Sequence, residues 1–542
     1  MIGVIADPTD HDVAREFFEL FKTPWEFWRD GRAYDVVVSA GEVRAGVSAR
    51  LLIVYAGHRL AFDGAESLSF PGQAEHGTLL VYEGMTLPIY GNTIGFPDRK
   101  NSALMDQGSA SCVLYSDSRE DGIIARLGYD LFKEVRHLLT IGQPSANASY
   151  PALELHISLL RDLINTTGIS LVEIPPVPDG YSFIACLTHD VDHPSIRRHR
   201  FDHTVLGFLY RAVITSTASL LRRKIPMRAL LRNWVAAARL PFVQIGLAQD
   251  FWYDFGEKYR AIEKDLPSTF FVIPFEGRPG ITAVGAAPSL RAARYGAKDI
   301  ATEIKKLVDS GCEVGVHGID AWIDSSKGQE ELSEIKQVAG ATAGIRMHWL
   351  YFNEQSPIAL EEAGAEYDST VGYNDTVGYR AGTTQVYKHL QAKQLLELPL
   401  HAMDTALFYP SYLDLSSSDA MQRVSKMIEN ADKFGGCFTV NWHDRSLAPE
   451  RNWDSCYREL IKELKDRGAW ITTAGQAVAW FRMRRSVTFS DVDNETAIET
   501  SIERACGNEL PKLSLRRHGT IIRGDGVRFR KYFETEGRSL QR

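Results

Sequence analysis

The feature that most constrains the fold is an alternation of strand-like and helix-like segments that begins after residue 180. Short apolar runs bounded by glycine or charge are typical of buried strands, and they occur here at 183–188, 269–273, 312–316, 396–400, 437–440 and 470–472. Amphipathic helices, each followed within two residues by glycine, are predicted at 297–310, 418–433 and 456–466. This alternation predicts a mostly parallel sheet, either open or closed into a barrel.

The chain on either side of this region has a different character. Residues 1–175 predict a mixed α/β domain of unknown role, with strands at 35–39, 51–55 and 78–82 and helices at 128–141 and 152–166. The linker 175–180 (PPVPDG) can continue neither a helix nor a central strand, because it contains three prolines. Residues 180–484 are the predicted barrel. Residues 485–542 form a small appendix, with short strands predicted at 487–489 and 519–530.

Composition excludes several classes of protein. The 542 residues are 44% hydrophobic and 24% charged, which is typical of a globular protein and excludes disordered and collagen-like chains. The six cysteines include no CxxC pair, so we expect buried reduced thiols rather than a zinc ribbon or a disulfide framework. The N-terminus lacks a basic segment followed by an apolar run, and no stretch of about 18 uncharged apolar residues is present. We therefore expect no signal peptide, no spanning helix and a cytoplasmic location.

Polar residues with catalytic potential stand at four separate strand ends, three of them after the runs named above and one at 346–348, where parallel α/β folds collect their functional groups. They are Asp190 and Asp192, His317, Arg346 and His348, and His443. Two carboxylates at positions i and i+2 of an extended chain point the same way, so one can bind a divalent metal while the other acts as a base. Each motif alone has a structural explanation, such as a solvated loop, a core histidine or a surface ion pair. Together they indicate a metal-dependent hydrolase.

The same residues carry a resemblance to a known family. The segments CLTHDVDH (186–193), STFFVIPF (268–275), GCEVGVHG (311–318), GIRMHWLYF (344–352) and FTVNWHD (438–444) resemble the motifs of the polysaccharide deacetylase superfamily (NodB homology, carbohydrate esterase family 4). The first motif is similar to that of a divergent branch that reads Thr-His-Asp-Val-Asp. The resemblance covers about 180–480 and implies a distorted (β/α) barrel that removes N-acetyl or O-acetyl groups from sugars with the help of a metal.

The resemblance also implies roles for individual residues. Asp190 resembles the general base, and Arg346 resembles the arginine that orients it. Asp192 and His317 resemble metal ligands, and His443 resembles the late histidine that acts as general acid. Leu398 and Pro399 fall near the fourth motif, which lines the acetyl pocket.

One position departs from the family pattern. The second metal-binding histidine is expected four residues after His317, where this chain has Ala321. The nearest replacements are Asp320 and His348. We favour His348, because it follows a strand beside Arg346 and would preserve an imidazole ligand. Two imidazoles and one carboxylate suit zinc best among divalent metals.

A basic segment follows the first motif directly. Residues 197–239 contain ten Lys or Arg and one acid, a charge of +9 against −17 for the rest of the chain, together with apolar residues at roughly helical spacing. This pattern is typical of a basic amphipathic helix at a membrane surface. The alternative is an insertion that packs its apolar face on the barrel. Nucleic-acid binding is not expected, because no recognised module accompanies the basic residues.

The leading hypothesis is a metal-dependent deacetylase of a surface polysaccharide or its lipid-linked precursor, with N-acetyl as the expected target. One alternative is a hydrolase of another amide C–N bond in a small substrate, because a fold does not determine its substrate. Another alternative is a catalytically weakened protein that serves as a glycan-binding or scaffold subunit, which Ala321 motivates.

Overall fold

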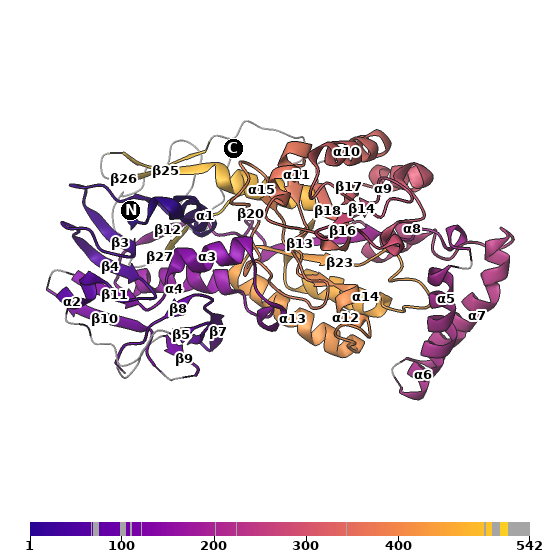
Figure 1. The fold of residues 1–542 in the computed structure, drawn as a ribbon, viewed down its shortest axis with the longest axis horizontal. Helices are drawn as coiled ribbons and strands as arrows, with labels where there is room; N and C mark the ends of the chain where they lie inside the picture. The colour runs from indigo at the N-terminus through magenta and orange to yellow at the C-terminus, as the bar shows by residue number, and fades with distance from the viewer. Residues whose placement is uncertain are drawn as a thin grey trace.

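The computed structural model describes residues 1–66, 68, 75–97, 104–108, 111–120, 122–200, 202–223, 225–342, 344–492, 495–500 and 510–518. The N-terminal sheet lies at one end of an elongated molecule, and the parallel sheet lies in the middle (Figure 1). The opposite end is formed by α5 (His203–Leu209), α6 (Ser216–Leu221) and α7 (Met227–Gln244).

The N-terminal region is built on a sheet with the strand order β10-β11-β4-β3-β1-β2, in which β10 alone is antiparallel to its neighbour. Its strands are β1 (Ile2–Ile5), β2 (Trp25–Phe27), β3 (Tyr34–Ala40), β4 (Ala49–Tyr55), β10 (Leu114–Arg119) and β11 (Gly122–Leu127). Its helices are α1 (His11–Phe21), α2 (Ala61–Ala65), α3 (Leu131–Thr140) and α4 (Ala152–Thr166). Small antiparallel pairings join β5 (Glu75–His76) to β8 (Asn92–Thr93), and β6 (Leu79–Tyr82) to β7 (Met85–Pro88) and β9 (Met105–Asp106).

The central sheet is mostly parallel, with the order β20-β21-β19-β18-β17-β14-β13-β23-β22 and with β24 beside β13. Its strands are β13 (Phe183–Val191), β14 (Thr269–Val272), β17 (Glu313–Gly318), β18 (Gly344–Met347), β19 (Tyr367–Asp368), β20 (Tyr387–Lys388), β21 (Leu396–Glu397), β22 (Ala402–Met403), β23 (Cys437–Asn441) and β24 (Ala469–Thr472). All nine residues of β13 are buried, as expected for a strand covered on both faces.

One extended segment, 396–403, closes this sheet into a barrel. Its first part, β21, pairs with β19, and its last part, β22, pairs with β23. Between them, Leu398 N–H donates to Asp368 O at 2.8 Å and His401 N–H donates to Thr439 O at 3.0 Å. The ring therefore runs β13, β14, β17, β18, β19, segment 396–403, β23 and back to β13. This confirms the predicted distorted (β/α) barrel.

Helices surround the barrel between its strands. They are α8 (Phe255–Glu263), α9 (Ala301–Asp309), α10 (Ser325–Ala339), α11 (Ser356–Ala363), α12 (Asp404–Phe408), α13 (Ser417–Phe434), α14 (Asp454–Asp466) and α15 (Ala474–Ser486). A two-stranded pairing of β15 (Ile281–Thr282) with β16 (Gly285–Ala286) lies between β14 and α9 in the chain. The helices predicted at 297–310, 418–433 and 456–466 correspond to α9, α13 and α14.

The basic segment forms a helical hairpin. The helices α5 (His203–Leu209) and α6 (Ser216–Leu221) are joined by a π-helical stretch at Tyr210–Thr215, and α7 (Met227–Gln244) returns alongside. We expected no helix able to span a membrane. The structure differs, because the continuous helix His203–Leu221 is long and apolar enough to do so by length and composition alone. The sequence criterion failed because it required an uncharged stretch, whereas this helix contains Arg211.

The C-terminal part returns to the junction between the two regions. Strand β27 (Arg516–His518) pairs with β12 (Leu171–Glu173), and β25 (Val487–Val492) pairs with β26 (Glu495–Thr500). The predicted strand at 487–489 lies in β25, and the one at 519–530 lies outside the described residues. The N-terminal region and the barrel share buried contacts. For example, the buried Arg484 guanidinium donates to the carbonyls of Ile174 and Leu20. The division at 175–180 stays a prediction.

Candidate active site

The first motif lies on β13, and its alternate residues face opposite sides of the strand. Asp190 and Asp192 both face His317, as the i, i+2 spacing predicts. His189 points the other way, where its ring nitrogens lie 2.8 Å from Glu263 Oε1 and 2.8 Å from Trp442 O. His189 is therefore a hydrogen-bonded core residue and not part of the site.

Asp190 is held from two sides. Its Oδ1 accepts a hydrogen bond from Arg346 Nη1 at 3.0 Å, and its Oδ2 accepts one from Asn441 Nδ2 at 2.7 Å. Burial acts to raise the pKa of Asp190, but the neighbouring His317, the Arg346 guanidinium and His443 outweigh burial and lower the pKa below the ordinary value. Asp190 is thus an ionised and oriented carboxylate, as a general base requires.

Arg346 is fully buried at the end of β18. Besides Asp190, its guanidinium donates to Thr188 Oγ1 at 2.7 Å and to the carbonyl and hydroxyl of Ser369 at 3.0 and 2.9 Å. It also lies 4.4 Å from the centroid of the Phe271 ring. Because the planar guanidinium is fixed by these contacts, its position relative to Asp190 is fixed too.

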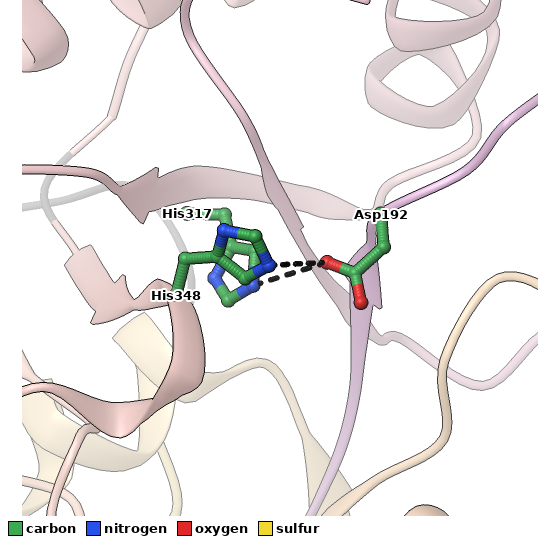
Figure 2. Close-up of side chains that lie close together, drawn as sticks. All are labelled: Asp192, His317 and His348. Atoms are coloured by element: carbon green, nitrogen blue, oxygen red, sulfur yellow. Dashed lines mark ion pairs between the residues drawn. The ribbon is translucent and has the colours of Figure 1, made fainter. Parts of the chain in front are cut away.

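Asp192, His317 and His348 converge on one point (Figure 2). Asp192 Oδ1 lies 3.3 Å from His317 Nε2 and 3.6 Å from His348 Nε2. Among the described residues, this buried oxygen has no hydrogen-bond partner. Ligand atoms that surround a tetrahedral zinc at bond lengths of about 2.0–2.1 Å are about 3.3 Å apart. The three side chains therefore have the donor types and the spacing that a divalent metal requires.

Neighbouring groups prepare both imidazoles for this role. His317 Nδ1 lies 3.0 Å from the carbonyl oxygen of Arg346, so Nδ1 carries the proton and Nε2 presents its lone pair. Burial lowers the pKa of His348 to about 3, which keeps its ring neutral. After His348 the chain turns through two residues with positive φ, Trp349 at 65° and Leu350 at 53°. Such conformations are strained for these residue types and cluster at functional sites.

The structure places Asp320 outside this cluster. Its Oδ1 accepts a hydrogen bond from Ile281 N–H at 2.8 Å, and its Oδ2 lies 3.1 Å from Lys327 Nζ. Ala321 is buried in the core of the barrel. His348 approaches instead because β17 and β18 are parallel neighbours that pair His317 with Arg346. His348 lies two residues after Arg346, so its side chain points to the same side of the sheet as that of His317.

His443 follows β23 and is paired with a carboxylate that we did not predict. Its Nδ1 lies 2.6 Å from Asp404 Oδ1, its backbone N–H donates to Asp404 Oδ2 at 2.7 Å, and its Nε2 lies 3.8 Å from Asp192 Oδ2. Burial acts to lower the pKa of His443, but the charges of Asp404, Asp192 and Asp190 raise it to about 10. The ring is therefore protonated at neutral pH, as a general acid must be.

These residues lie at the base of a cavity of about 440 Å³. Its wall is rich in aromatic side chains and includes His203, Trp349, Tyr351, Tyr409, Tyr412 and Arg445. The prediction for the fourth motif is wrong in detail, since Leu398 packs in the hydrophobic core and neither Leu398 nor Pro399 lines the cavity. Both lie too early in the closing segment to reach the open end of the barrel. Met403 and Thr405 line the cavity instead.

Two residues that hold the catalytic groups were missed by the sequence reasoning. Asn441 orients Asp190 and was overlooked, although it belongs to the segment FTVNWHD that the sequence reasoning singled out. Asp404 holds His443 and begins α12 directly after the closing segment. The one signal for Asp404 is an acidic residue that follows the segment LELPLHAM (396–403).

A second group of potential ligands, Asp368, His389 and Glu397, is fully buried in the barrel wall. Burial raises the pKa of Glu397 to about 8 and that of Asp368 well above its ordinary value. Carboxyls with raised pKa values carry less charge for a metal to neutralise, although Asp368 Oδ2 has no hydrogen-bond partner among the described residues. Neighbouring groups hydrogen-bond to the other carboxyl oxygens. For example, His389 Nε2 lies 3.1 Å from Glu397 Oε2.

Comparison with known proteins is informative at the level of fold. No protein-family model and no curated protein matches the chain. Among solved structures, a Mycobacterium smegmatis protein described as a polysaccharide deacetylase is 19% identical, over 57% of this chain and 95% of its own, with a TM-score of 0.35. A probable polysaccharide deacetylase from Pseudomonas aeruginosa is 12% identical, over 56% and 92% of the two chains, with a TM-score of 0.32. A CE4 family pseudoenzyme from Bacillus anthracis is 15% identical, over 42% and 60%, with a TM-score of 0.25.

The structure is thus a closed parallel barrel with a carboxylate and imidazole cluster where its strands end. The solved structures named above carry the name of the superfamily whose motifs the sequence resembles. At these identities and TM-scores the comparison does not bear on activity, and the Bacillus anthracis protein is itself a pseudoenzyme.

Proposed function

We propose that the protein is a metal-dependent hydrolase that removes acetyl groups, N-acetyl in particular, from a sugar of a surface polysaccharide or its lipid-linked precursor. The observation that carries the proposal is the buried Oδ1 of Asp192, which accepts no hydrogen bond among the described residues and is faced by two imidazole nitrogens at 3.3 and 3.6 Å. A buried carboxylate oxygen with this environment is costly unless a cation completes it.

Asp192, His317 and His348 would hold the metal, and their donor set suits zinc better than the oxygen-seeking metals. When bound, such an ion supplies Lewis-acid chemistry: it lowers the pKa of a water molecule and polarises a carbonyl group. The replacement of the expected histidine by Ala321 does not weaken the proposal, since His348 offers the same ligand atom.

The protein groups then divide the proton transfers. Asp190 Oδ2, which faces His317 Nε2 at 3.8 Å, is placed to take a proton from the attacking water. Arg346 and Asn441 keep that carboxylate ionised and oriented. His443, held protonated by Asp404, donates a proton to the departing amine nitrogen of the sugar.

An acetylated sugar fits the cavity better than a small aliphatic amide does. The aromatic side chains of its wall, including Trp349 and Tyr409, offer flat apolar faces for a pyranose ring. The volume of about 440 Å³ falls within the usual range for ligand sites.

Acetate release from N-acetylglucosamine oligomers tests the proposal. Asp190→Asn should abolish turnover and leave the bound metal, measured by elemental analysis, nearly unchanged. Retained activity in that variant would show that the base is assigned wrongly. About one equivalent of metal without acetate release would favour hydrolysis of another amide. Absence of bound metal would favour a glycan-binding or scaffold role.

We also propose that the helical hairpin, residues 203–247, lies on an anionic membrane surface. Of the twenty large apolar side chains that are exposed in the described part of the chain, twelve lie between Leu206 and Leu247. Both helices are apolar on two sides. One side packs around Phe208, Leu240 and Trp252, and the other side is uncovered, with Leu221 80% and Leu231 52% exposed.

Charge favours a lipid surface as the partner. Residues 203–247 contain seven Lys or Arg and no Asp or Glu. A second copy of this chain on the same face would bring like charges together, whereas anionic headgroups would neutralise them. The inner sides of both helices are attached to the barrel, which favours a helix pair that lies in the interface over one that spans the bilayer.

Vesicle flotation tests this partner. Full-length protein should bind vesicles of phosphatidylcholine with phosphatidylglycerol, and the double substitution Leu231→Asp and Val235→Asp should weaken binding by about tenfold or more. The matched control, Val284→Asp with Ile323→Asp, changes exposed apolar residues elsewhere and should bind normally. Equal binding by both variants, or a dimer that the first variant dissociates, would refute the proposal. The cytoplasmic side of a membrane is the corresponding proposed location.

A further inference from the structure

Three arginines, Arg211, Arg445 and Arg451, gather beside the catalytic cavity, and some of their nitrogen atoms lack hydrogen-bond partners among the described residues. The guanidinium groups of Arg445 and Arg451 lie over the rings of Trp252 and Trp453, each 4.7 Å from the ring centroid. Arg445 lines the cavity, and Arg451 donates a hydrogen bond to the hydroxyl of Tyr409, which also lines it. Both arginines are more than nine-tenths buried, at 8% and 7% exposure. In the described part of the chain, no hydrogen-bond partner is present for Nη1 of Arg445, for Nε and Nη1 of Arg451, or for Nε of Arg211.

The charges of this cluster do not balance. Arg211, which lies in the hairpin, interacts electrostatically with four neighbouring groups: Arg445, Arg451, Glu450 and Tyr409. Burial and the repulsion of Arg451 and Arg445 lower the pKa of Arg211 to about 10. Both oxygens of the neighbouring Glu450 are likewise without hydrogen bonds among the described residues. Asp444 also acts on Arg445, so three cations against two carboxylates leave a local charge of about +1.

The neighbouring acids are already engaged. Asp404 is paired with His443, and Asp444 accepts the backbone N–H of His193 at 2.8 Å. Buried guanidinium donors without partners are costly and are rare in folded proteins unless an ion or water completes them. The planar donor forks of arginine match the oxygens of a phosphate group.

We infer that Arg211, Arg445 and Arg451 form a binding site for a phosphate group of the substrate, beside the sugar whose acetyl group is removed. A phosphate ester or diphosphate presents three or more acceptor oxygens to the several unpartnered donors, whereas a sugar carboxylate presents two. The inference rests on the proposed function in one respect, the identity of the sugar. It narrows the substrate class to phosphate-linked acetylated sugars.

Calorimetric titration of the full chain with inorganic phosphate and pyrophosphate, in a chelator so that no metal contributes, tests the site. We expect binding that Arg445→Gln and Arg451→Gln each weaken by about tenfold or more. The matched control Arg198→Gln removes the same charge from the surface of the basic segment, where Arg198 is paired with Asp299 at 3.1 Å, and should bind as the parent does.

A thermal readout separates a binding role from a structural one. Without phosphate, Arg445→Gln should melt at the same or a higher temperature than the parent, because the substitution relieves repulsion between the arginines. Addition of phosphate should raise the melting temperature of the parent and leave that of the variant unchanged. Four results would each overturn the inference. The variant could melt lower than the parent in both conditions, or the parent could fail to bind phosphate. Arg198→Gln and Arg445→Gln could bind phosphate equally, or the parent could bind glucuronate in place of phosphate. The titration uses no acetylated sugar, so its outcome does not depend on whether the protein is a deacetylase.

Discussion

Substitution of Asp404 by asparagine should change the pH dependence of the reaction without removing any group that touches the substrate. Asp404 Oδ1 lies 2.6 Å from His443 Nδ1, and the carboxylate is fully buried. Asparagine keeps an oxygen at this position that can accept the Nδ1 hydrogen bond, but it removes the negative charge. The expected result is a lower pKa for His443 and an unchanged position of the ring.

The magnitude follows from the environment of the ring. Asp404 is the largest of the influences that raise the pKa of His443 to about 10. An opposite charge at this distance shifts a pKa by about 1–3 units, equivalent to about 1.4–4 kcal/mol. A bound cation would lower the pKa in parent and variant alike, so the two are compared at equal metal content. Because the acid must be protonated, loss of Asp404 should move the alkaline limb of kcat/KM to lower pH by about 1–3 units.

The assay compares two leaving groups. Deacetylation of N-acetylglucosamine oligomers needs a proton for the departing amine, whereas hydrolysis of p-nitrophenyl acetate releases a stable anion. The alkaline limb should therefore shift for the first substrate and not for the second. Ser446→Ala is the matched control, because it removes a hydrogen bond to Asp404 and keeps the charge. An unshifted limb for the oligomers would refute the role of His443 as the acid.

Three further changes separate metal binding from structure. His348→Ala should reduce bound metal at least about tenfold, whereas the control Asp320→Ala should retain the metal. Bound metal is measured by elemental analysis after dialysis, and equal metal loss in both variants would point to an indirect effect. His189→Phe should leave metal content unchanged but reduce the free energy of unfolding in urea by about 2–3 kcal/mol, since the buried Glu263 loses a partner. Arg484→Met should reduce the free energy of unfolding by about 3 kcal/mol, because buried carbonyls between the N-terminal region and the barrel lose their hydrogen-bond donor. A change below about 0.5 kcal/mol would show that these contacts contribute little to stability.

Sequence pattern predicted individual elements in the barrel and in the N-terminal region alike. The run at 183–188 became β13, and the helix at 152–166 matches α4. The strand order depends on pairings between distant segments, such as Ile184 with Cys437, which local periodicity does not contain. The segment 396–400 was predicted as one strand, yet its extension to 403 has different partners at its two ends, because an apolar run looks the same whichever strand lies beside it.

The candidate site was predictable where its residues end strands and unpredictable where they depend on contacts across the barrel. Asp190, Asp192, His317, Arg346 and His443 stand at strand ends, so their types and positions were visible in the sequence, and their roles remain proposals. Asp404 and Asn441 act through side chains of other strands. The buried arginines beside the cavity were not recognised, because a guanidinium in a loop has no pattern of its own.

The segment that closes the barrel also determines where the acid of the reaction can sit. Residue 404 is the next residue after β22, so the carboxylate beside His443 is in place only while the ring is shut. The ladder bonds of Leu398 and His401 and the protonation of His443 then belong to one cooperative unit. If this seam opened, through a mutation or mild denaturant, we expect the proposed proton donor to be displaced before the proposed metal ligands, which lie on or directly after β13, β17 and β18 rather than on the closing segment. A local opening alone would then leave the proposed ligand cluster in place without its acid.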